Sequence, residues 1–437
     1  MSPHTVSRRD LLKGGGGIAA GWTVLRVSGT AEARGNGPGD HVDWVHGSGE
    51  LRESYPGEPG DVVIDWLDQP ADVPPPAQGV VGNLLDWESL STRLTPSDNF
   101  FTVKHYDLPA IDPSTWQVEV TGLVARPFSM SLADLMARPR REVEFTLECS
   151  GNTGLPFFIG GIGNAVWGGA QLAPLLHRAR PLDSATEVVF WGTDRGTVTI
   201  RDNSGVTSAG NTGIGEPDAG GGLDLTITEQ FARSMTLDDA MASGNLLSYA
   251  MNGSALPPEH GAPVRLIAPG WYGVANVKWL SKIEVTDHRY AGRFMARDYV
   301  TFREHTDPSG TTTWTFENVG RYRLKSAPAH VVRNGNEYRI IGVAWGGAIA
   351  SVEVSIDGGP WQPAELAEAG RGRGGSRELA WQFWTLDWAT ATAGQHTITS
   401  RAIDRDGQVQ PAPDDPLIAD KRTYWESNGY ITRTVVI

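Results

Sequence analysis

The only cysteine of the chain lies in the run Glu144-Phe145-Thr146-Leu147-Glu148-Cys149-Ser150-Gly151-Asn152-Thr153-Gly154. The run begins like a strand and passes at Cys149 into a loop of small residues, which can bring backbone close to a ligand. A lone cysteine is most simply a small buried apolar residue. A thiolate at the end of a strand is also well placed to bind a soft or high-valent metal. With one cysteine, the chain can form no intrachain disulfide and no metal site made of cysteines alone.

A second informative passage begins about 100 residues later. It reads Leu246-Leu247-Ser248-Tyr249-Ala250-Met251-Asn252-Gly253, His260-Gly261-Ala262-Pro263-Val264-Arg265, Ala268-Pro269-Gly270 and Asn276-Val277-Lys278-Trp279-Leu280. Together with the Cys-Ser-Gly-Asn run, it resembles the sulfite oxidase family of molybdopterin-dependent oxidoreductases. The resemblance implies that Cys149 ligates molybdenum and that Arg265, Lys278 and His260 belong to the cofactor pocket. A guanidinium and an ammonium are suited to the phosphate of a pterin cofactor, because together they neutralise its charge.

Three shorter matches extend this resemblance. The run Phe100-Phe101-Thr102-Val103-Lys104-His105 is similar to the family's Phe-Phe-Thr-Arg-Asn-His loop, which makes His105 a cofactor-binding candidate. Asp194 ends a strand-like run in a region that lines the pterin in the family. Tyr299 matches a family tyrosine that faces the metal, and a phenol there can donate a hydrogen bond or move a proton. The simpler interpretation of Tyr299 is an ordinary half-buried tyrosine.

The substrate side departs from the family pattern. Val103 stands where sulfite oxidases have an arginine, Thr153-Gly154 replaces an arginine pair, and Phe157 takes the place of a tryptophan. Lost guanidiniums remove the charge-assisted hydrogen bonds that hold an oxyanion. Lys104 could supply one positive charge, as a point charge without the planar fork. The chain also resembles catalytic subunits of sulfane dehydrogenases in its Glu-Cys-Ser-Gly-Asn run.

The N-terminus has the pattern of an export signal. Arg8 and Arg9 precede a weakly apolar, glycine-rich run and the small-x-small site Ala31-Glu32-Ala33, which is typical of a twin-arginine signal peptide. We therefore expect residues 1–33 to direct the protein to the periplasm or the extracellular space. No other segment is long and apolar enough for a membrane helix, so we expect no membrane span in the mature protein.

Composition and strand pattern predict two domains after that signal. The chain has 437 residues, 53 glycines and 28 prolines, which favours β-rich units with many turns. We expect an irregular segment over 34–89, a mixed α/β molybdopterin-binding domain over 90–319 and an all-β immunoglobulin-like dimerisation domain over 320–437. The fold class is therefore α+β. Helices are expected over 131–138 and 171–179, and strands over 116–120, 187–191, 338–343, 350–356, 381–386 and 396–402.

The expected function is oxygen-atom transfer to a small inorganic sulfur compound, most simply sulfite to sulfate, at a mono-pyranopterin molybdenum-molybdopterin centre. The chain has no Cys-x-x-Cys-His motif, so we expect no haem in it and electron transfer to a separate c-type cytochrome. A homodimer, or a heterodimer with a cytochrome subunit, is expected. The net charge of −14 argues against nucleic-acid binding, which requires a basic surface.

Three alternatives stay open at this stage. The chain could be a sulfane dehydrogenase catalytic subunit acting on carrier-bound sulfur, or a molybdenum reductase with another substrate. Outside the enzymes, it could be an exported binding protein on a decayed cofactor scaffold. The joint presence of Cys149, Arg265 and Lys278 argues against such decay.

Overall fold

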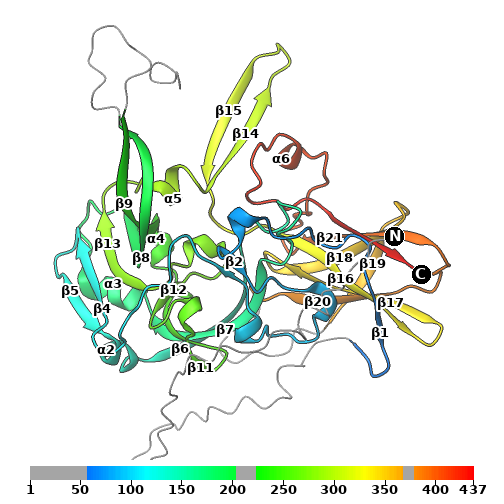
Figure 1. Cartoon of the computed structure of the whole chain (residues 1–437), viewed down its shortest axis with the longest axis horizontal. Helices are drawn as coiled ribbons and strands as arrows, with labels where there is room; N and C mark the ends of the chain where they lie inside the picture. Colours follow the sequence, from blue (N-terminus) through cyan, green and yellow to red (C-terminus); the bar gives the residue numbers. More distant parts are fainter. Residues whose placement is uncertain (1–56, 203–222, 368–377) are drawn as a thin grey trace, which may run out of the picture. The chain divides into compact units, whose positions relative to one another are not determined.

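Strands predominate in the computed structural model, which describes residues 57–202, 223–367 and 378–437 (Figure 1). The predicted signal peptide at 1–33, the first part of the segment at 34–89 and the Gly/Arg-rich loop at 369–377 lie outside the described residues. Within the described ranges, no helix combines the length and the apolar character that a membrane span requires. The structure confirms the α+β class, with short helices set among many strands.

The C-terminal part is a barrel-like β sandwich. Its hydrogen-bonded strands follow the order β1 (Val62–Ile64), β16 (Lys325–Asn334), β17 (Glu337–Trp345), β20 (Gln382–Asp387), β19 (Gln362–Leu366), β18 (Ile349–Ile356), β21 (Gln395–Asp404) and β22 (Ile431–Val436). Four of these, β17, β18, β20 and β21, are the strands expected from the sequence. A bridge between Trp66 and Val435 links the first strand of this order to the last. Strand β1 comes from the segment at 34–89, so that segment is tied into the C-terminal sandwich.

Alternating apolar side chains explain why this sandwich forms. In β17, β18 and β21 the inward-facing residues Ile340, Val352 and Ile398 are fully buried, and they pack around Trp384 of β20. Each such side chain contributes about 1.5–3 kcal/mol through its removal from water.

Two five-stranded sheets form the N-terminal part. The first has the order β11 (Ser254–Ala255), β10 (Leu246–Met251), β7 (Ile162–Gln171) and β6 (Arg140–Glu148), with β12 (Arg265–Ile267) also paired to β10. The second has the order β5 (Phe128–Ser131), β4 (Gln117–Gly122), β13 (Leu280–Thr286), β8 (Glu187–Asp202) and β9 (Leu223–Thr236). Strands β4 and β8 contain the runs predicted at 116–120 and 187–191.

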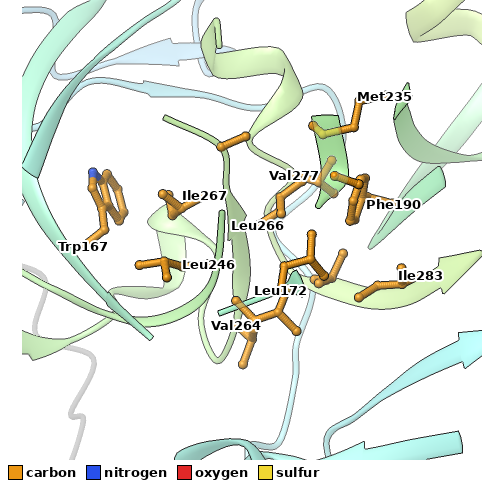
Figure 2. Close-up of a cluster of buried hydrophobic side chains, with 14 of the residues drawn as sticks. Trp167, Leu172, Phe190, Met235, Leu246, Val264, Leu266, Ile267, Val277 and Ile283 are labelled. Atoms are coloured by element: carbon orange, nitrogen blue, oxygen red, sulfur yellow. The ribbon is translucent and has the colours of Figure 1, made fainter. Parts of the chain in front are cut away.

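A shared apolar core joins these two sheets. Leu246 and Leu266 from the first sheet lie near Phe190 and Ile283 from the second, and Trp167 of β7 lies at the edge of the same cluster (Figure 2). Because β12 and β13 both contribute to this core, the segment between them is held at its two ends. That segment carries Asn276 and Lys278.

The helices are short. The sequence-predicted helices are present as α2 (Leu132–Met136), which Ser131 caps in a capping box with Asp134, and α3 (Ala173–Ala179). The other described helices are α4 (Leu237–Ala240), α5 (Arg293–Ala296), α6 (Pro416–Ala419) and the 3-10 turns η2 (Pro75–Ala77), η3 (Trp87–Ser89), η4 (Ser97–Asn99), η5 (Pro258–His260) and η6 (Gly273–Ala275). Two two-stranded sheets complete the fold, β2 (Val81–Gly82) with β3 (Thr102–Val103) and β14 (Val300–Thr306) with β15 (Thr312–Asn318).

Candidate active site

Cys149 directly follows β6, where the chain leaves the first sheet. Its backbone N–H donates to the carbonyl of Gly161 at 2.8 Å, and its own carbonyl accepts from the N–H of Asn152 at 2.9 Å. The side chain is buried, and burial raises the pKa of the thiol to about 12. In the cofactor-free protein the residue is therefore a neutral thiol. It becomes a metal ligand only when the metal displaces its proton.

A buried ion pair anchors the residue before this cysteine. The Glu148 carboxylate lies 2.6 Å from Lys325 Nζ, and both side chains are fully buried. The same carboxylate accepts from Trp345 Nε1 at 2.9 Å and from Asn152 Nδ2 at 3.0 Å. These partners satisfy the charges in a place where an unpaired one would be strongly destabilising. Because Lys325 begins β16, the C-terminal sandwich fixes the position of the Cys149 loop.

A first cavity has Cys149 in its lining, together with the other five residues that the sequence predicted to bind the cofactor. Its charged and titratable lining residues are Lys104, His105, Asp194, Glu259, His260, Arg265, Lys278 and Tyr299. Arg265 is buried on β12 and donates to the carbonyls of His260 at 3.0 Å and Asn276 at 2.9 Å, while its Nε has no partner among the described residues. Lys278 Nζ donates to the carbonyl of Glu259 at 3.0 Å.

The charges that line the first cavity favour the binding of an anion. Burial lowers the pKa of Arg265 to about 9, and burial together with the neighbouring Arg265 lowers the pKa of Lys278 to about 7. Burial also lowers the pKa of His260 to about 4 and raises that of Asp194 to about 6. Each shift means that the ionised form lacks sufficient stabilisation in the protein alone. A bound phosphate would supply it to the cations.

Tyr299 and His105 form a neutral pair beside the cysteine. The tyrosine hydroxyl lies 2.7 Å from His105 Nε2. Burial, followed by the nearby Lys278, lowers the pKa of His105 to about 3. Burial, followed by Cys149, raises the pKa of Tyr299 well above its ordinary value. The hydrogen bond to a neutral imidazole fixes the direction of the phenol hydroxyl, which can then take part in proton transfer with a molecule in the cavity.

A second cavity also has Cys149 in its lining. It shares Val103, His105, Cys149 and Tyr299 with the first cavity. Val103 and Phe157, both predicted substrate-side residues, line this second cavity. Lys104 lines the first cavity and not the second, so its charge lies in the same cavity as those of Arg265 and Lys278.

Among the lining residues of the second cavity that sequence reasoning missed are two large aromatic ones, Tyr424 and Trp425. They come from the segment between α6 and β22, far from Cys149 along the chain. Trp425 stacks on Tyr299 with ring centroids 4.3 Å apart. The only signal available in the sequence was an adjacent pair of large aromatic residues in a turn-rich segment, which carries no periodicity.

This fold and this site define an oxidoreductase domain that binds a molybdopterin cofactor. Residues 105–211 and 218–294 match the family model described as "Oxidoreductase molybdopterin binding domain", and residues 323–427 match the "Mo-co oxidoreductase dimerisation domain". The chain is 33% identical over 349 residues to sulfite oxidase of Gallus gallus, a match that covers 74% of this chain and 70% of that protein. It belongs to the sulfite oxidase family.

Other known proteins agree with this membership. Mitochondrial sulfite oxidase of Homo sapiens is 32% identical over 344 residues, which cover 73% of this chain and 57% of the human protein. The chain thus spans little more than half the length of the mammalian relatives that it matches. Among solved structures, the sulfane dehydrogenase SoxCD from Paracoccus pantotrophus has the same fold, with a TM-score of 0.64, 23% sequence identity and coverage of 92% of this chain and 95% of that chain.

The chain is therefore a molybdopterin-dependent oxidoreductase, as the sequence predicted, and its cofactor is molybdenum-molybdopterin. The residues around the first cavity fit that group. Arg265 and Lys278 offer positive charge to a phosphate, and the buried Arg265 Nε and Asp194 Oδ1 atoms have no partner within the described structure. A pterin with ring donors and acceptors could supply such partners. Cys149 offers a sulfur ligand to the metal at the place where the two cavities meet.

Proposed function

We propose that this protein is an exported enzyme that transfers an oxygen atom to the sulfur of a small inorganic sulfur compound, with sulfite to sulfate as the simplest reaction. One observation carries the proposal. The cationic pair Arg265–Lys278, the Tyr299–His105 pair and Cys149 surround one cavity, in a chain similar to sulfite oxidases over three quarters of its length. Two electrons then leave one at a time to an external c-type cytochrome.

The protein residues bind, orient and move protons. The molybdenum cofactor supplies the oxygen-atom transfer chemistry when it is bound. Cys149 would hold the metal, Arg265 and Lys278 would hold the phosphate of the cofactor, and His260 and Asp194 would contact its pterin. Tyr299 accepts or donates the proton that accompanies exchange with water, and His105 orients its hydroxyl through the 2.7 Å hydrogen bond.

The partners follow from charge and domain organisation. The net charge of −14 favours docking of a basic electron carrier, which a c-type cytochrome can provide. The dimerisation-domain match supports a homodimer, or a heterodimer with a cytochrome subunit. The twin-arginine pattern at Arg8 and Arg9 supports export to the periplasm or the extracellular space. The twin-arginine route carries proteins that are already folded.

A specific observation favours a second candidate, oxidation of sulfur bound to a carrier protein. The second cavity is lined largely by apolar and aromatic residues, and no arginine or lysine is among the described residues that line it. A carrier could deliver sulfur there without a free dianion. This reaction is suggested by the name of the sulfane dehydrogenase with the same fold.

The test is metal analysis combined with turnover. Protein exported from a molybdopterin-competent host is assayed for molybdenum and for sulfite-dependent reduction of cytochrome c, beside Cys149→Ala. Stoichiometric molybdenum with sulfite turnover, both lost in the variant, supports the proposal. Molybdenum without sulfite turnover directs the search to carrier-bound sulfur. Export is tested separately with Arg8→Lys and Arg9→Lys together, which should leave the precursor in the cytoplasm.

A further inference from the structure

The second cavity is the place where a substrate can reach the metal-binding thiol. Cys149 and Tyr299 line both cavities, so a molecule in the second cavity lies next to the cofactor site. Its apolar and aromatic lining residues are Ala77, Val80, Val81, Val103, Leu155, Phe157, Phe158, Tyr299, Tyr424 and Trp425. This lining offers dispersion contacts and few hydrogen bonds.

The charged groups of the second cavity give no net attraction for an anion. Asp298 is the one carboxylate among the described lining residues, and it accepts from Arg293 Nε at 2.5 Å and Arg297 Nε at 2.7 Å. Burial would raise the pKa of Asp298, but these two hydrogen bonds outweigh burial and hold the pKa below its ordinary value. Both guanidiniums are thus already engaged. His105, the other titratable base in the lining, is neutral at pH 7.

The aromatic wall of this cavity is held in place before any ligand binds. Trp425 stacks on Tyr299 at 4.3 Å and lies 4.0 Å from the ring of Tyr424. The next residue, Glu426, donates its backbone N–H to the carbonyl of Ser150 at 2.7 Å, and its carboxylate accepts from Thr301 Oγ1 at 2.7 Å. The C-terminal part therefore supplies a fixed aromatic surface beside the Cys149 loop.

A glycine shows how closely these two segments pack. A Cβ atom on Gly154 would lie 2.0 Å from the carbonyl oxygen of Tyr424. Any side chain at 154 would therefore displace the aromatic segment. The small residue at this position is what allows Tyr424 and Trp425 to approach the loop after Cys149.

Such a cavity discriminates by charge. A dianion would lose its hydration there without gaining a cationic side chain, which is unfavourable. An uncharged sulfur group loses little on desolvation, and its polarisable sulfur gains from contact with aromatic rings. The lining therefore favours binding of an uncharged sulfur compound over binding of a sulfur-containing dianion.

We propose that the second cavity takes uncharged thioethers, which the site oxidises to sulfoxides, and that Val103 and Trp425 set this selection against sulfite. The proposal rests on the oxygen-atom transfer to sulfur of the proposed function, and it adds neutral organic sulfur as the preferred substrate beside the inorganic one. In the reaction, the thioether sulfur forms a bond to an oxygen atom that comes from water. Two protons are released, and two electrons pass in separate steps to a one-electron acceptor such as a c-type cytochrome or ferricyanide.

The test compares a neutral substrate and its product, methyl phenyl sulfide and its sulfoxide, with an anionic substrate and its product, sulfite and sulfate. Binding of methyl phenyl sulfoxide and of sulfate to the molybdenum-loaded protein is measured by isothermal titration calorimetry. Turnover of methyl phenyl sulfide and of sulfite is measured with ferricyanide as acceptor. We expect the sulfoxide to bind at least about tenfold more tightly than sulfate, and kcat/KM to favour the sulfide by a similar factor.

Two sets of variants locate the selection. Val103→Arg should reverse the preference by at least about tenfold, because a guanidinium can bind the dianion by two hydrogen bonds. Leu108→Arg adds the same charge at an exposed residue that lines neither cavity, and should change nothing. Trp425→Ala should weaken sulfoxide binding about tenfold while Trp425→Phe retains most of it.

The failures of the two proposals are distinguishable. Wild-type protein that binds sulfate more tightly and turns over sulfite faster than the sulfide would overturn this inference and leave the proposed function intact. Insensitivity of both ligands to Val103→Arg and Trp425→Ala would also overturn it. Molybdenum-loaded protein that turns over neither substrate contradicts the proposed function, and the inference fails with it.

Discussion

The two cavities that meet at Cys149 differ sharply in charge although they share four lining residues. The first contains Arg265, Lys278 and Lys104, and its cations are poorly neutralised by the protein itself. The second is lined largely by apolar and aromatic groups, with Asp298 already paired. The cationic side chains therefore line the first cavity and not the second. The difference shows that a resemblance to the family in the cofactor pocket does not imply a resemblance in the substrate pocket.

The largest effect is expected from Cys149→Ser, which removes the sulfur where the cavities meet. Molybdenum content and turnover should both fall to background, because a neutral hydroxyl is a poor ligand compared with a thiolate. Serine is similar in volume, so the thermal midpoint of cofactor-free protein should change little. Metal analysis and differential scanning calorimetry check the two parts. A variant that keeps stoichiometric molybdenum would contradict the assignment of Cys149 as the ligand.

The next largest effect is expected from Tyr299→Phe. It removes the hydroxyl that lies 2.7 Å from His105 Nε2 and keeps the ring that stacks on Trp425. We expect kcat to fall about 100-fold to 10,000-fold, the range for a proton-transferring group, with molybdenum content unchanged. Because the pKa of Tyr299 is raised well above its ordinary value, wild-type activity should show no loss from phenol ionisation between pH 7 and pH 9. Equal kcat for both proteins would assign Tyr299 to packing alone.

Lys278→Met tests the cationic side with a smaller effect. Loss of one charge-assisted contact should weaken binding of inorganic phosphate to cofactor-free protein about tenfold to 100-fold. Calorimetry measures this, with Lys282→Met as the matched control. Lys282 pairs with Glu284 at 3.0 Å and does not line either cavity.

The same lysine gives the binding a defined pH dependence. The pKa of Lys278 is lowered to about 7, so part of the protein holds the neutral amine at neutral pH. A bound phosphate favours the ammonium and raises that pKa. Phosphate binding at pH 8 should therefore take up a proton and weaken as pH rises above 7. Titrations in two buffers with different ionisation enthalpies measure the uptake, which should disappear in Lys278→Met.

The sequence was sufficient to predict the local parts of this comparison. The strands β17, β18, β20 and β21 follow from alternating apolar residues between glycine turns, and helix α2 follows from its capping residue Ser131. The strands and the helix depend on neighbours in the chain, which periodicity and turn chemistry describe well. The residues of the cationic cavity were predicted from the resemblance of contiguous motifs to those of the family.

The long-range parts could not be predicted in the same way. Trp425 reaches Tyr299 and Lys325 reaches Glu148 through pairings between residues more than 100 positions apart. No local pattern distinguishes a tryptophan that lines a cavity from one in a core. The placement of Lys104 on the cofactor side depended on the direction of one side chain after β3, which spacing does not specify.

The smallest expected effect comes from Asp194→Asn, and its sign is opposite to that of Lys278→Met. Burial raises the pKa of Asp194 to about 6, so the carboxylate is ionised at pH 7.5 and opposes an anion in the first cavity. Its neutralisation should tighten phosphate binding about twofold to fivefold, the scale of one partly screened charge. Below pH 5 the wild-type carboxyl is protonated, so the two proteins should bind phosphate equally. Sulfoxide binding in the second cavity should be unaffected at either pH. A similar gain for both ligands would mean that the two cavities share one electrostatic environment, and the contrast between them would then lie in shape alone.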